Sequence, residues 1–228
     1  MDATDPQPAT LARLASLTAL VLAALFIASI LLGPGGVLHG DPDAATALAF
    51  AAEHGRALAL LGLLDGLINT LFGVLIVLLI ALAGKDGVLA CIAYISAGAA
   101  MAIQWTHAGM LYALGELAQR GGADAGVLAL FALGSTMDDA DGIVIPLAMV
   151  CAGWLLLRSQ RAPAFIGWLT VVVAGIGMLQ TLVAALGGPD AGPVTVLSAW
   201  IWLVGTGIAL LVRPVSHSAS AQYFSTVR

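Results

Sequence analysis

Charged residues are scarce in this chain, making up 9% of its 228 residues, whereas 61% are hydrophobic. A soluble domain carries roughly a quarter charged residues. The few charges also cluster, which leaves apolar runs of about 20 residues, the length that crosses a hydrocarbon layer of about 30 Å. Lipid is therefore the expected solvent for most of the protein.

Several chemical signatures are missing. The two cysteines, Cys91 and Cys151, lie inside apolar runs without CxxC spacing, which favours small buried hydrophobic residues. There is no P-loop, HExxH or Gly-x-Ser-x-Gly elbow, and no basic patch for nucleic acid. One membrane-embedded histidine cannot supply the nitrogen ligands of a zinc or bis-His haem site. The sequence thus predicts no catalytic residue, no metal site and no nucleic-acid partner, and leaves any cofactor unknown.

Turn signals divide the chain into six apolar spans. The predicted spans cover about residues 14–32, 57–83, 88–114, 142–157, 165–186 and 194–212, in one transmembrane domain over 1–213 with a flexible tail at 214–228. The expected fold class is an all-α polytopic membrane bundle with short interfacial helices on its outer side. One of these is predicted at Asp43 to Phe50, behind an aspartate cap. Another, interfacial or re-entrant, is predicted at 125–133, cut from the fourth span by the polar run 135–142.

Basic residues orient this topology. Six of them fall on one side, namely Arg13, Lys85, Arg158, Arg161, Arg213 and Arg228, and only Arg56 and Arg120 fall on the other. By the positive-inside rule the first side is cytoplasmic. Both termini are therefore predicted inside, in a multi-pass protein of the bacterial inner membrane.

Two stretches resemble an uncharacterised bacterial family of six-span membrane proteins, known only as a domain of unknown function. Arg13-Leu14-Ala15 opens the first span where that family has an Arg-x-Ala-Gly start, with Ser16 in place of the glycine. The connection from Leu157 to Leu169 is similar to the family's Arg-Ser, Pro, Gly-Trp-Leu connection between spans four and five. The resemblance implies the six-span architecture and assigns no functional residue.

Polar side chains inside a membrane are costly, so each of them needs an explanation. Asp65 of the second span, Gln104 and His107 of the third, Asp138 and Asp141 before the fourth and Gln180 of the fifth all fall in the outer third, and Asn69 is four residues from Asp65. Because consecutive spans alternate in direction, their common depth does not follow from sequence spacing. It predicts one outward-facing polar site in which residues three or four apart share a helix face. A histidine near carboxylates could relay protons or bind a cation.

The same residues also admit a structural interpretation. Asp65 and His107 could form one interhelical hydrogen bond that fixes packing, and the acids from Asp138 to Asp141 could cap the fourth span. Pro146 could free a carbonyl near Gly142 for a ligand, or merely kink the helix. Close helix packing is the favoured role of the span glycines Gly62, Gly66, Gly73, Gly175 and Gly177, and interfacial anchoring that of Trp200 and Trp202.

These patterns favour a non-enzymatic membrane protein with an outward-facing polar pocket for a small ligand, an ion or a partner protein. A transporter or a component for proton or ion permeation is the first alternative, and an intramembrane enzyme is the second. Transport comes second because the two halves show no convincing inverted repeat. The expected partners are the lipid bilayer and either another membrane protein or further copies of this chain.

Overall fold

A chain surrounded by hydrocarbon must satisfy its backbone polar groups internally, and an α-helix does so within one segment. The computed structural model describes residues 8–32, 44–84, 87–120, 124–188 and 192–212, whose regular structure is helical without a strand. The helices are α1 Pro8–Leu32, α2 Ala44–Ala83, α3 Val88–Gln119, α4 Asp124–Ser159, α5 Ala164–Ala185 and α6 Gly192–Val212. Each has a stretch long and apolar enough to cross a membrane, which confirms the predicted all-α six-helix bundle. The predicted tail 214–228 lies outside the described residues.

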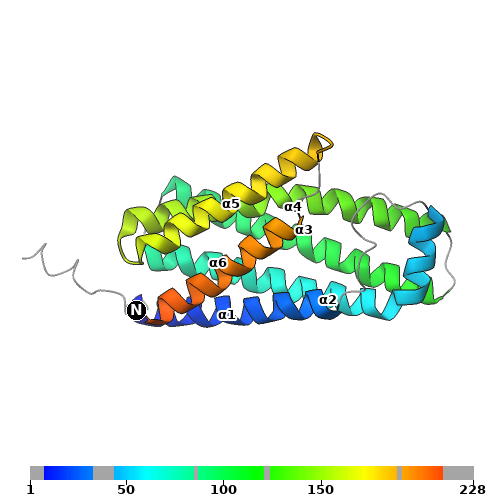
Figure 1. The fold of residues 1–228 in the computed structure, drawn as a ribbon, viewed down its shortest axis with the longest axis horizontal. Coiled ribbons are helices and arrows are strands. Elements are labelled where there is room, and N and C mark those ends of the chain that lie inside the picture. Colours follow the sequence, from blue (N-terminus) through cyan, green and yellow to red (C-terminus); the bar gives the residue numbers. More distant parts are fainter. Residues whose placement is uncertain (1–7, 33–43, 85–86, 121–123, 189–191, 213–228) are drawn as a thin grey trace, which may run out of the picture.

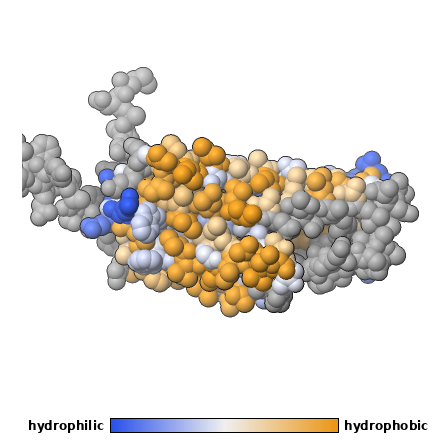
Figure 2. Space-filling view, turned by 90° about the horizontal axis from the view of Figure 1, so that it is seen from above, coloured by the Kyte–Doolittle hydropathy of each residue, from blue (hydrophilic) through white to orange (hydrophobic). Residues whose placement is uncertain are grey.

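Successive helices run in opposite directions (Figure 1). The start of α1, the α2–α3 turn, the α4–α5 connection and the end of α6 share one end of the bundle, here called the basic end after Arg13, Arg158 and Arg161. The opposite end is called the far end. The α2–α3 turn needs glycine because Gly84 has a φ of 57° and Gly87 a φ of 118°. Figure 2 shows a largely apolar surface along the bundle, with hydrophilic side chains at its ends.

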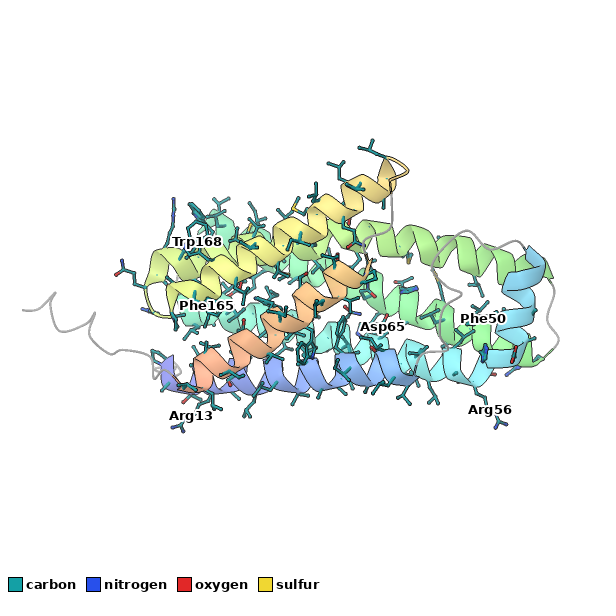
Figure 3. All side chains as sticks on the ribbon, in the orientation of Figure 1. Arg13, Phe50, Arg56, Asp65, Phe165 and Trp168 are labelled. Atoms are coloured by element: carbon teal, nitrogen blue, oxygen red, sulfur yellow. The ribbon has the colours of Figure 1, made fainter. Side chains whose placement is uncertain are left out.

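The six helices differ in length. α2, α3 and α4 have 40, 32 and 36 residues, whereas α1, α5 and α6 have 25, 22 and 21. At 1.5 Å per residue the long helices measure about 48 to 60 Å, more than a hydrocarbon layer of about 30 Å requires. They extend beyond the others at the far end (Figure 1). The first turns of α2, around Phe50, lie across that end before the helix turns near Arg56, so the predicted interfacial helix is part of α2 (Figure 3).

α4 differs from the prediction of a separate segment at 125–133. It is one continuous helix through the polar run 135–142 and through Pro146. The physical reason is the extension of α2 and α3, which gives the first half of α4 a surface to pack on. Leu130 contacts a small core there, formed by Phe50, Ala51, Leu58 and Leu114. The helix therefore continues where the sequence alone indicates a break.

The main core lies toward the basic end. α2 contributes large aliphatic side chains such as Leu75 and Leu79, and α3 and α4 pack on them with small residues, including Ala93 and Ala152. Small residues at a helix interface let backbones approach closely, which is the main source of packing energy in a bilayer. Of the two cysteines, Cys151 is buried as predicted, but Cys91 is exposed on the bundle surface.

Some helix glycines pack against a neighbouring helix, whereas others have open space around them. A Cβ on Gly153 of α4 would lie 2.9 Å from the carbonyl oxygen of Gly167 on α5, and a Cβ on Gly62 would lie 2.6 Å from that of Ala108. Gly66, Gly73 and Gly177 also face neighbouring side chains, as predicted. Gly175 does not, since a Cβ there would meet nothing within 4 Å. Its predicted packing role is wrong.

Trp202 is a second correction. The predicted interfacial anchor is fully buried, and its indole Nε1 donates to Thr170 Oγ1 at 2.8 Å. Thr170 in turn donates to the Ile166 carbonyl at 2.7 Å. The ring also lies 5.6 Å from that of Phe72 between centroids. Trp202 therefore joins α6 to α5 and α2 inside the bundle, while Trp200 is half-buried.

Candidate functional site

Five of the seven predicted site residues come together between α2, α3 and α4. We call Asp65, Asn69, Gln104, His107 and Asp141 the polar layer. Counted from the basic ends of their helices, they lie at heights of about 21 to 29 Å, at 1.5 Å per residue. This is the level at which an apolar span of about 30 Å ends. The common depth predicted from the sequence corresponds to real proximity.

His107 and Asp65 form the more accessible half of the layer. His107 Nδ1 lies 3.8 Å from Asp65 Oδ2, and the two side chains are 12% and 34% exposed. The other side of the imidazole faces α4, because a Cβ on Gly134 would be 3.6 Å from His107 Nε2. The ring is thus held between a carboxylate on α2 and a glycine on α4. Figure 3 shows Asp65 on α2, in the half of the bundle toward the far end.

Two amide side chains link this half to a buried carboxylate. Asn69 Nδ2 donates to the Asp65 carbonyl at 3.0 Å and to Gln104 Oε1 at 3.2 Å. Gln104 Nε2 then donates to Asp141 Oδ2. Gln104 and Asp141 are only 6% and 7% exposed. The hydrogen bonds therefore cross three helices, from the Asp65 main-chain carbonyl on α2 to the buried Asp141 carboxylate on α4.

α5 reaches the layer through the residue next to Asp141. Pro146 has no N–H, so the Gly142 carbonyl lacks its helical donor. Thr181 Oγ1 of α5 donates to that carbonyl at 3.1 Å. The hydroxyl therefore supplies the missing donor, whereas the sequence allows either a carbonyl open to a ligand or a mere kink of the helix. Nothing in the sequence pairs Thr181 with Gly142, because they are far apart along the chain.

The positions of the other two predicted site residues, Gln180 and Asp138, are less closely defined. Gln180 precedes Thr181 on α5 and is half-buried beside this junction. The backbone of Asp138 is helical, one turn before Asp141, but its side chain lies outside the described part of the structure. Because α4 continues through both acids, they do not stand at a helix N-terminus, and the predicted cap of the fourth span is wrong.

A small cavity lies directly beside the layer, toward the basic end. Its volume is about 10 Å³, which is room for about one water molecule. Asn69 is the polar side chain in its lining, and the rest are apolar: Phe72, Gly73, Ala97, Ala100, Met101, Ile145 and Ala148. A cavity of this size has room for about one water molecule and excludes an organic ligand.

The layer separates two apolar cores on all three helices. On α2, Asp65 lies between Leu58 of the small far-end core and Leu75 of the main core. On α3, Gln104 and His107 lie between Ala97 and Leu114 in the same way. Asp141 has the equivalent place on α4, between Leu130 and Ala148.

The groups of the layer can supply charge, hydrogen bonds and proton transfer. The layer offers two carboxylates, an imidazole and two amides. Among the described residues, no group of three or more His, Cys, Asp or Glu side chains is arranged to hold a metal ion. No protein-family model, curated protein or solved structure matches this chain.

Proposed function

We propose that this chain is a non-enzymatic protein of a bacterial inner membrane whose polar layer binds a positive charge from the outer side. Six apolar helices indicate an integral membrane protein. The observation that carries the proposal is that one layer holds the partly exposed Asp65 carboxylate beside His107 and the buried Asp141 carboxylate, which Gln104 and Asn69 link to α2. Two acids in one layer, one of them buried, favour an added positive charge, either a proton or a small monovalent cation.

The small size of the site favours a proton or a small ion as the ligand over an organic molecule. The layer is packed, and the adjoining cavity of about 10 Å³ has room for about one water molecule. A proton needs no cavity, and a small cation would need the carboxylate oxygens of the layer, because the lining of the cavity is apolar apart from Asn69. Asp65, at 34% exposure, provides the entrance.

Binding is favoured over permeation by what lies below the layer. A path through the membrane would need polar groups toward the basic end. The described residues that pack there are mainly aliphatic, with Leu75 and Leu79 of α2 facing Ala93 of α3. The orientation of the layer toward the outside follows from the predicted cytoplasmic position of Arg13, Arg158 and Arg161.

The test measures thermal unfolding of the purified protein in detergent, in a proton arm from pH 5 to 8 and a cation arm with Na⁺, K⁺ or choline at fixed ionic strength. A proton or cation whose free concentration is 100 times its dissociation constant stabilises the folded protein by about 2.7 kcal/mol. We expect the wild type to respond in at least one arm. Asp141→Asn should lose the response, because asparagine keeps an oxygen for Gln104 but not the charge.

Glu116→Gln is the matched control. Glu116 is a far-end carboxylate paired with Arg120 at 2.9 Å, outside the polar layer, and its variant should respond as the wild type does. If Asp141→Asn and His107→Gln both keep the wild-type response in both arms, the layer only fixes helix packing. A wild type that responds in neither arm would refute the proposal directly.

A further inference from the structure

The α4–α5 connection presents two arginines that no carboxylate neutralises within the described residues. Arg158 and Arg161 are both exposed, and the described salt bridges do not include either of them. The far end differs, because Arg120 there is paired with Glu116 at 2.9 Å. Among the residues that the structure describes, the connection is therefore a local concentration of positive charge.

Local contacts and the backbone turn at Gln160 hold the two arginine side chains in place. Arg158 Cζ lies 5.4 Å from the centre of the Trp154 ring, over its face. Gln160 has a φ of 56°, a left-handed conformation that a residue with a side chain rarely adopts. The Arg161 N–H then donates to Ser159 Oγ at 3.3 Å, and the guanidinium lies against Gly84 of the α2–α3 turn. The turn at Gln160 thus holds Arg161 at the end of the bundle.

Exposed aromatic side chains lie just below the arginines. Trp154 is 41% exposed, Trp168 57% and Phe165 58%. The two tryptophans lie within about 8 Å of the ends of their helices at 1.5 Å per residue. This is the depth at which tryptophan is enriched at membrane interfaces, so the guanidinium groups are at headgroup level. Figure 3 shows Trp168 projecting away from the bundle.

We propose that the surface formed by Arg158, Arg161, Trp154 and Trp168 binds the headgroup of an anionic phospholipid. A guanidinium matches a phosphate with two parallel hydrogen bonds. Below the headgroup, Trp168, Val172 and Leu179 form an exposed apolar strip along α5, on which the acyl chains of the same molecule lie. That strip is why a lipid fits this surface better than free phosphate. The proposal does not depend on the polar layer.

Arg13 supplies a matched control. It is exposed at the same basic end but belongs to α1, and Figure 3 shows it on the side of the bundle opposite Trp168. Removing it changes the net charge of that end by the same amount as removing Arg158. It leaves the proposed lipid surface intact.

The experiment uses native mass spectrometry of the full chain in detergent with added phosphatidylglycerol or phosphatidylcholine. The wild type should retain phosphatidylglycerol preferentially, and each arginine replaced by glutamine should weaken retention about fivefold. Arg158→Gln with Arg161→Gln should therefore abolish the preference, while Arg13→Gln should keep it. Equal retention of the two lipids by the wild type, or an unchanged preference in the double variant, would overturn the proposal.

Two further arms keep the result decisive if the double variant does not fold. Raising NaCl from 50 to 500 mM should release phosphatidylglycerol from the wild type and leave bound phosphatidylcholine unchanged, because salt screens exposed charges. Inorganic phosphate at 10 mM should leave the lipid in place. Complete displacement by phosphate, or retention that salt does not change, would contradict binding through these arginines.

Discussion

Replacing Thr181 by valine should destabilise the protein by about 1 kcal/mol, because it removes the donor to a carbonyl that α4 cannot satisfy itself. Pro146 lacks the N–H that would bond the Gly142 oxygen, and Thr181 Oγ1 lies 3.1 Å from it. A buried acceptor left unpaired costs about 1 to 3 kcal/mol. Interhelical hydrogen bonds in membranes average nearer 0.6 kcal/mol, with a maximum near 1.7. Valine has the same shape, so packing is preserved.

The decisive comparison is a double-mutant cycle with Pro146→Ala. Alanine restores an N–H that can donate to Gly142, so Thr181→Val should cost less in that background, by about 0.5 to 1 kcal/mol. Thr181 Oγ1 also lies 3.2 Å from the Gly177 carbonyl of its own helix, and its single proton is shared between the two acceptors. In the alanine background the hydroxyl can turn wholly to Gly177, so the cost of Thr181→Val that remains there is that of the bond within α5. The cycle therefore measures the bond between α4 and α5 relative to that local bond.

The assay is unfolding by sodium dodecyl sulfate in mixed micelles, followed by tryptophan fluorescence for the four proteins of the cycle. Thr106→Val is the control, because the Thr106 hydroxyl is exposed and bonds the Ala102 carbonyl of its own helix. It should change the free energy of unfolding by less than about 0.5 kcal/mol. Thr181→Val could instead cost the same with proline and with alanine at position 146. That result would refute the idea that the Thr181 hydroxyl takes the place of the missing N–H of residue 146.

Three further predictions concern packing and topology. Gly153→Ala should cost about 1 to 3 kcal/mol in the same titration, because its Cβ would lie 2.9 Å from the Gly167 oxygen. Gly98→Ala has open space around it and should not destabilise, so equal losses would contradict the assigned helix contact. Trp202→Phe should cost about 1 kcal/mol through its lost bond to Thr170, and an unchanged midpoint would contradict this contribution. In intact cells, an impermeant maleimide should label Asp41→Cys but not Ser159→Cys, and outside labelling of Ser159→Cys would reverse the predicted topology.

The number and order of the helices could be predicted because they depend on apolar length and on turn residues. The depth of the polar layer could be predicted for the same reason, since depth is a count along a helix. The rotation of a helix is different, because lipid-facing and core-facing positions are both apolar in a membrane. This is why Trp202 and Gly175 were assigned to the wrong surroundings.

The continuity of α4 could not be predicted because it depends on other helices. Serine, aspartate and glycine between residues 135 and 142 are typical of a loop when only the local sequence is considered. The structure keeps them helical because Leu130 packs on the far-end core, while Asp141 bonds Gln104. The resemblance to a six-span family, at Arg13-Leu14-Ala15 and from Leu157 to Leu169, stays a prediction.

The position of the polar layer between two apolar cores explains how a bound charge could affect the rest of the molecule. Toward the basic end, aliphatic and small side chains pack the helices together. Beyond the layer, the described side chains of α2, α3 and α4 form the small core around Leu58 and Leu114. Gln104 contacts both Asn69 and Asp141, so it links all three helices at the level where these cores meet. A charge added there acts on the Asp65–His107 pair or on Asp141 without touching either core. Its effect should therefore be on the orientation of the far-end extension, while the membrane core stays packed.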